Sequence, residues 1–175
     1  MPSTHLLASQ LMLAEIPSAV PWARRHTDDV LRRWRVPPDT TEAALLIVSE
    51  LAANSVRHAQ PLVRGPLHYG ELANAGTFTT LLQLSGPRLV VQVGDRDPHA
   101  PVLRASKGAA DGGLRLVNAL SHQWGHYRPR GAPGKIIWAE LRLDAPSVRW
   151  PSIAERDSPT DPRLLSRVLA GLHEL

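Results

Sequence analysis

The first third of the chain has the hydrophobic pattern of one strand followed by two helices. Residues that favour β-structure predict a strand over Gln10–Ile16, which Pro17 ends. Ser18 is placed to cap a first helix that runs to about Arg35. The candidate core residues of this helix recur at helical spacing and are Val20, Ala23, Val30, Leu31 and Trp34.

A second amphipathic helix is predicted after the break at Pro37-Pro38. Asp39 or Thr40 can cap this helix, which is expected to run from Thr41 to Ala59. Its apolar stripe consists of Ala44, Val48, Leu51, Ala52, Ser55 and Ala59. The stripe predicts which face of the helix packs on a core.

Strands, loops and one more helix make up the rest of the pattern. Region 60–76 contains two prolines and three glycines and is expected to be a loop. The strands expected after it are Thr77–Leu84, Arg88–Gly94 and Ile136–Leu143, the first two joined as an antiparallel hairpin across Ser85-Gly86-Pro87. Residues 95–110 form a long polar loop. Gly112-Gly113 then open a third helix, Leu114 to about Trp124, whose inward-facing residues are Leu116, Val117 and Leu120.

These elements indicate one domain over residues 10–144, preceded by an N-terminal segment, 1–9. Residues 145–161 have the composition of a Pro-rich linker. Residues 162–175 predict a C-terminal amphipathic helix with the apolar residues Leu164, Leu165, Val168, Leu169 and Leu172.

The composition is that of a globular protein, with 43% hydrophobic and 21% charged residues in a chain of 175. The chain has no cysteine, which excludes disulfides, thiolate metal sites and cysteine nucleophiles, and suits a reducing cytoplasm. No apolar run is long enough to cross a bilayer, and the N-terminus lacks the order of a signal peptide. A cytoplasmic location, with no membrane partner, is expected.

The net charge is +4 and the sequence pI is near 10.3, which raises the question of anionic partners. Much of the excess lies on the first predicted helix, in Arg24, Arg25, Arg32, Arg33 and Arg35. A solvated or acidic-partner-facing surface explains these arginines better than DNA does, because no nucleic-acid motif accompanies them.

The most informative polar residues are Glu50 and Asn54, four positions apart on the second helix. That spacing places one side chain above the other, with Arg57 and His58 on the same side one turn further. Two interpretations are open: a solvated helix face, or a site that holds a metal ion and a water. For the second, the amide oxygen of Asn54 suits Mg²⁺, and Glu50 can orient or deprotonate an attacking group.

Two further features suit a nucleotide. Asp95 ends a β-rich run, where a buried carboxylate can accept a hydrogen bond from the exocyclic amine of adenine; the alternative is an ordinary turn or cap residue. Gly112-Gly113 precede a helix whose free amides suit phosphate, although glycine is also sterically convenient at a helix start.

Four motifs occur in a fixed order: ELAANSVRHA, VVQVGDRDPHAP, DGGLRLVNALSHQWGH and PGKIIWAEL. As a set, over roughly Leu11 to Leu143, they resemble the anti-sigma-factor protein-serine kinases of the GHKL (Bergerat-fold) ATPases. The resemblance implies a two-layer α/β sandwich, with helices on one face of a mixed, mainly antiparallel sheet. It also implies that the nucleotide lies between the helices and a lid.

The resemblance further implies roles for individual residues. Glu50 corresponds to the general base, Asn54 to the Mg²⁺ ligand and Asp95 to the residue that recognises adenine. Gly112 and Gly113 belong to the lid and the helix start under the phosphates. The residues expected to contact ATP are Asn54, Arg57, His58, Asp95, Asp97, Lys107, Gly112, Gly113, Leu114 and Lys135. ATP and Mg²⁺ are the implied cofactors.

The chain departs from the family pattern in both nucleotide motifs. Asp97 stands where a glycine is usual, and Asp111 replaces the first lid glycine. An acid beside phosphates weakens their binding unless Mg²⁺ or a base offsets its charge. Ala109 stands where kinase members carry an arginine, and the candidate substitutes in the same loop are Lys107 and Arg104.

In the last strand Lys135 and Ile136 replace the usual threonine pattern. Lys135 either reaches phosphate or is a solvated residue at the strand end, and the sequence favours neither.

Two functions remain open. The first is an ATP- and Mg²⁺-dependent protein-serine kinase that acts on an anti-sigma-factor antagonist, with a sigma factor as a further partner and a homodimer as a candidate assembly. The second is a non-catalytic module of the same fold that sequesters such a partner, which the altered lid favours. A histidine kinase is disfavoured, because neither His5 nor His26 lies on a dimerisation helix. His122 and His126 are spaced four apart without a carboxylate partner that would make a metal site.

Overall fold

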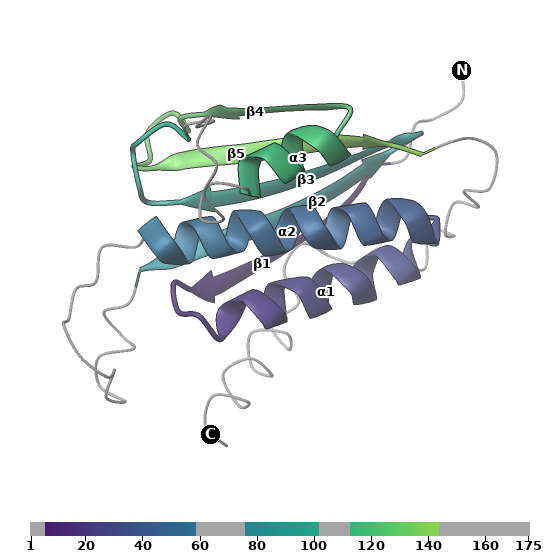
Figure 1. The fold of residues 1–175 in the computed structure, drawn as a ribbon, viewed down its shortest axis with the longest axis horizontal. Helices are drawn as coiled ribbons and strands as arrows, with labels where there is room; N and C mark the ends of the chain where they lie inside the picture. The colour runs from purple at the N-terminus through teal and green to yellow at the C-terminus, as the bar shows by residue number, and fades with distance from the viewer. Residues whose placement is uncertain (1–5, 59–75, 102–112, 144–175) are drawn as a thin grey trace.

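The structure is a computed structural model that describes residues 6–58, 76–101 and 113–143 (Figure 1). Its elements in chain order are β1 (Leu6–Ala14), α1 (Ala19–Arg33), α2 (Pro38–His58), β2 (Thr77–Ser85), β3 (Arg88–Asp95), α3 (Gly113–Leu120), β4 (Gln123–Tyr127) and β5 (Lys135–Arg142).

The strands form a five-stranded sheet in the order β1-β2-β3-β5-β4. All four pairings between neighbouring strands are antiparallel. The three helices lie together on one side of this sheet (Figure 1). The predicted two-layer α/β sandwich is therefore confirmed, with a sheet that is antiparallel throughout its described strands.

The hydrophobic core lies between the two layers. Strand residues alternate between the faces, so β2 buries Phe78, Leu82 and Leu84 against the helices while their neighbours are partly exposed. Helix α2 crosses the middle of the sheet and packs on β2, β3 and β5. The members of its predicted stripe that the structure describes are all buried: Ala44, Val48, Leu51, Ala52 and Ser55.

Two predicted boundaries near the N-terminus are wrong, and a third is correct without the expected side-chain cap. Strand β1 begins at Leu6 rather than Gln10, because the whole segment pairs with β2 in continuous register. Helix α2 begins at Pro38, which places Asp39 in its first turn instead of at the cap. Ser18 is the N-cap residue of α1, as predicted, but its side chain makes no capping hydrogen bond.

The largest error concerns the segment after α3. We predicted one helix to about Trp124, but α3 ends at Leu120 and Gln123–Tyr127 forms the edge strand β4. The Ser121 hydroxyl donates to the Val117 carbonyl at 2.7 Å, and the next backbone N–H, of His122, donates to the Glu140 carbonyl at 2.8 Å. Pairing with β5 thus replaces helical hydrogen bonds. His122 and His126 accordingly do not share a helix, and both are exposed.

Several predictions fall outside the described residues. They include the loop 60–75, the lid, the linker and the C-terminal helix, together with Lys107 and Gly112 of the expected ATP contacts. Within the described ranges, the structure contains no helix both long enough and apolar enough to cross a membrane.

Candidate functional site

The candidate site lies at the end of the sheet where β3 and β5 meet. Asp95, the last residue of β3, pairs in register with Lys135, the first residue of β5. Gly134 allows this approach: its φ is 97°, and a Cβ there would overlap the Asp95 carbonyl oxygen and lie 2.8 Å from the Cα of Arg96. Only glycine adopts such a conformation at no steric cost, so the turn before β5 can bring Lys135 against Asp95.

The carboxylate of Asp95 is buried and held from two sides. Its side chain is 5% exposed. Oδ2 accepts a hydrogen bond from the Ser55 hydroxyl at 2.9 Å, and Oδ1 accepts one from Lys135 Nζ at 2.9 Å and one from the Asp97 backbone N–H at 3.2 Å. Since a carboxylate accepts about four hydrogen bonds, one acceptor position remains, on Oδ2.

Asp97 completes the cluster. Lys135 Nζ lies 2.8 Å from its Oδ2 and 3.3 Å from its backbone carbonyl oxygen. The backbone N–H of His99 donates to Oδ1 at 3.1 Å, and His99 Nδ1 lies 2.6 Å from the same oxygen. Burial alone would raise the pKa of Asp97, but the hydrogen bonds from Lys135 and His99 outweigh it and hold this pKa well below its usual range.

Lys135 fits neither of the two roles predicted for it. Its side chain is 5% exposed, so it is not a solvated residue at the strand end. Its three N–H donors end on Asp95 Oδ1, Asp97 Oδ2 and the Asp97 carbonyl, which leaves none for phosphate. The reason is the strand alternation: Lys135 faces the helix layer and Ile136 the opposite side, and an ammonium group buried there needs counterions.

Ser55 is a site residue that the sequence did not identify, because its position made it part of the apolar stripe of α2. Its hydroxyl lies within hydrogen-bond distance of the Leu51 carbonyl, at 3.3 Å, as well as of Asp95. A buried serine hydroxyl needs an acceptor either on its own helix or on the facing sheet, and this requirement was the available signal.

Glu15 is a second residue that the sequence did not identify. It follows β1, and its backbone N–H donates to the Gly76 carbonyl at 2.8 Å. Burial raises the pKa of Glu15 above its ordinary value, and the Asp95 carboxylate raises it further, against smaller opposing effects of Arg96 and Lys135. Acidic groups that follow the edge strand β1 and end the central strand β3 thus lie near the ammonium group of Lys135.

Glu50 and Asn54 face the start of α3. A Cβ added to Gly113 would lie 2.5 Å from Glu50 Oε2 and 3.7 Å from Asn54 Nδ2. The pair and the first residue of α3 are therefore neighbours in space, and a side chain at Gly113 would displace Glu50. Leu114, another expected ATP contact, is buried in the hydrophobic core.

Arg57 and His58, at the end of α2, are both exposed. The Arg57 Nη2 group donates a hydrogen bond to the Asn54 Oδ1 atom. This amide oxygen is the one that a metal ion would use, so Arg57 and a bound cation would share it or compete for it. Among the described residues, no group of three or more His, Asp or Glu side chains forms a further metal site.

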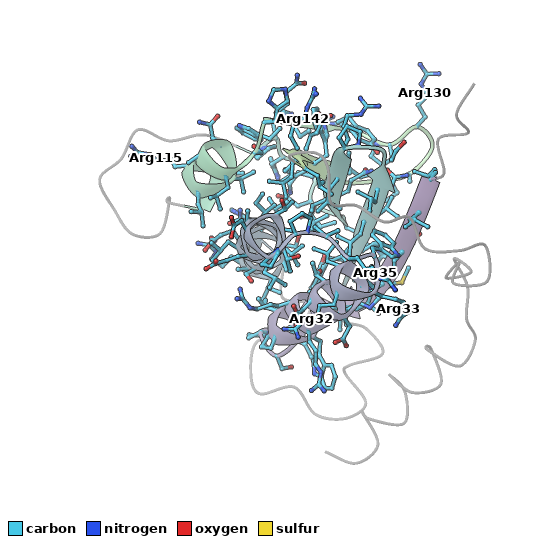
Figure 2. The ribbon with its side chains drawn as sticks, turned by 90° about the vertical axis from the view of Figure 1, so that its right-hand side faces the viewer. Arg32, Arg33, Arg35, Arg115, Arg130 and Arg142 are labelled. Atoms are coloured by element: carbon cyan, nitrogen blue, oxygen red, sulfur yellow. The ribbon has the colours of Figure 1, made fainter. Side chains whose placement is uncertain are left out.

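The arginines are distributed over several elements. Figure 2 shows Arg32, Arg33 and Arg35 around the end of α1, Arg115 on α3 and Arg142 on the sheet, standing well apart. Arg32 also pairs with Asp28 at 2.9 Å.

Comparison with known proteins identifies a family for this chain. The family model described as the histidine kinase-like ATPase domain matches residues 13–141, which include every element that contributes to the site. A search of curated proteins found no significant match. This family is part of the GHKL-type superfamily that the motifs indicated. An ATPase domain of this kind implies ATP binding. The chain therefore belongs to the histidine kinase-like ATPase domain family.

Proposed function

We propose that this protein is an ATP- and Mg²⁺-binding regulator of the anti-sigma-factor type, which phosphorylates a serine or threonine of an anti-sigma-factor antagonist. The observation that carries the proposal is that one helix, α2, contacts both Asp95 and the start of α3. Ser55 of α2 holds the buried Asp95, while Glu50 and Asn54 of the same helix meet the start of α3 at Gly113. A base site and a phosphate site are thus joined through one rigid element.

In this proposal Asp95 recognises the base. Its remaining acceptor position suits the exocyclic amine of adenine, and its orientation is set before the nucleotide arrives. Gly113, with Gly112 and Lys107 of the preceding segment, would contact the phosphates. Asn54 would hold Mg²⁺ through its neutral amide oxygen, and the bound ion would offset the phosphate charge.

Glu50 would carry the chemistry. The hydroxyl oxygen of the partner's serine bonds to the γ-phosphorus, and the bond from that phosphorus to the β–γ bridging oxygen breaks. ADP leaves with the electron pair of that bond, and the carboxylate of Glu50 takes the hydroxyl proton. Glu50 suits this role because it is partly buried beside Gly113.

The test is phosphate transfer from γ-labelled ATP to a cognate anti-sigma-factor antagonist. Glu50→Gln is expected to slow transfer by about 100-fold or more, because a positioned base contributes about that much. ATP affinity should change little. The control is Glu42→Gln, an exposed residue on the same helix, which should leave transfer unchanged. Transfer at the wild-type rate in Glu50→Gln would remove Glu50 from the mechanism.

A second candidate function is a non-catalytic module that sequesters a sigma factor or another regulator. The contact of Arg57 with Asn54 Oδ1 favours it, because the guanidinium occupies the oxygen that Mg²⁺ would need. Asp111 in the lid favours it as well. Titration calorimetry with ATP and Mg²⁺ separates the two: absence of binding would leave the sequestering function, and Mg²⁺-dependent binding would favour the kinase.

A further inference from the structure

Lys135 and the two aspartates that it contacts form a closed set of interactions. The ammonium group uses all of its N–H donors on Asp95 and Asp97, as described above, and the three side chains are 5%, 5% and 16% exposed. Among the described residues, every buried side-chain nitrogen or oxygen has a hydrogen-bond partner. Rotation of any one of these side chains would therefore break a hydrogen bond to another member of the cluster.

The charges in the cluster depend on one another. Without the ammonium group, the carboxylates of Asp95 and Asp97 would lie close together in a largely buried place with no counterion, and Asp95 would lose the hydrogen bond that fixes its Oδ1 atom. Without the Asp97 carboxylate, Lys135 would keep an unused N–H donor beside Asp95 and present it to whatever binds there.

We propose that Lys135 and Asp97 act as one positioning pair, which holds the Asp95 carboxylate turned so that a single acceptor position faces the base. This inference rests on the proposed ATP binding. Both residues are among the positions where the chain departs from the family pattern. In this proposal the two departures compensate for each other, because the charge of Lys135 neutralises that of Asp97. Neither residue contacts the nucleotide itself.

The pair makes a specific prediction about base selectivity. With Asp97 present, the site offers one acceptor and no free donor, which suits the amine of adenine and rejects the carbonyl oxygen that guanine carries at the same ring position. With Asp97 removed alone, the freed N–H of Lys135 can donate to that oxygen. Selectivity for ATP over GTP should therefore fall when the pair is broken.

The experiment is a double-mutant cycle with the full chain: wild type, Asp97→Gly, Lys135→Thr and the double variant. Calorimetry measures ATP and GTP affinity in Mg²⁺, and urea unfolding checks each fold. Lys135→Thr should lose about tenfold or more in ATP affinity, which corresponds to coupling typical of neighbouring buried groups. The double variant should recover to within about threefold of wild type. The preference for ATP over GTP should fall in both single variants and return in the double variant.

The matched control is Arg88→Thr, which removes a basic group from the exposed end of the same strand pair. It should change neither affinity nor base preference.

Losses that simply add in the double variant would overturn the pairing, as would unchanged base preference in both single variants. If Lys135→Thr does not fold, a folded, ATP-binding double variant supports the pairing, and a double variant that also fails to fold overturns it. If the wild type binds no ATP, the proposed function and this inference both fail. If ATP binds but Glu50→Gln transfers phosphate normally, only the assignment of Glu50 fails.

Discussion

The two ends of the β3–β5 strand pair carry the same kinds of charge in opposite surroundings. At one end Asp95 faces Lys135, and both side chains are 5% exposed. At the other end Arg88 is paired with Arg142, and Glu140 lies 4.0 Å from the first and 3.1 Å from the second. These two arginine side chains are 56% and 51% exposed. One strand pair thus contains a buried ion cluster and an exposed one.

The difference between the two ends is one of desolvation. An exposed ion pair gains little, because water screens it and long side chains lose freedom in forming it. A buried pair is costly to break, because the remaining charge is left without water or partner. Substitution of a charged residue at the exposed end should therefore cost little stability. At the buried end each charged group has a specific hydrogen-bond partner, so the same kind of substitution should cost more.

The largest expected effect breaks the buried cluster itself. Lys135→Met should lower the free energy of unfolding by about 3 kcal/mol or more at neutral pH, since two carboxylates lose their counterion. Arg88→Met, on the same strand pair, should cost less than about 1 kcal/mol. Urea denaturation of both variants measures the comparison. Similar losses in the two would mean that burial does not distinguish these ends.

A smaller effect is expected from the turn that positions Lys135. Gly134→Ala adds a Cβ against the backbone of Asp95 and Arg96 at a φ of 97°, and should cost about 2 kcal/mol. Gly131→Ala in the same turn also has a positive φ, 77°, but meets open space, so about 1 kcal/mol is expected. Thermal unfolding ranks the two variants. An equal loss would show that the contact with Asp95 contributes nothing.

The smallest effect concerns the pH dependence of stability at the buried end. The pKa of Glu15 is raised, so the folded state binds its proton more tightly, and this contribution to stability is present at low pH and lost as pH rises through the raised pKa. Glu15→Gln should remove that loss, so its stability relative to wild type should increase as the pH rises above the ordinary carboxyl pKa.

The pKa of Asp97 is shifted in the opposite direction to that of Glu15, so Asp97 serves as the comparison. The pKa of Asp97 is lowered, so its contribution is present above its ordinary pKa and lost as pH falls toward the lowered value. Asp97→Asn should therefore lose stability at neutral pH, and the deficit should shrink in acid. Unfolding curves recorded across this range test both signs, and parallel pH profiles for the two variants would contradict the assignment.

Much of the fold followed from local pattern. The stripe of α2, the hairpin of β2 and β3 and the position of Asp95 at a strand end were all readable, because burial on one face imposes a period on the residues. Strand β4 was not readable. Trp124 continues the helical spacing of Leu116 and Leu120, and the segment Gln123–Tyr127 becomes a strand only because the backbone of β5 pairs with it. Its Gly125 lies against the ring of Trp138, a contact distant in sequence.

For the site, residue types and spacing were sufficient to bring Glu50, Asn54, Asp95 and Gly113 into consideration, because helix and strand periods are local properties of the backbone. The partners of the charges were not available in this way. Whether Lys135 lies in water or between two aspartates, and whether Ser55 is a core residue or a donor to Asp95, depends on which strands and helices meet. Burial and hydrogen bonding are set by neighbours far along the chain, and the folded arrangement alone supplies those neighbours.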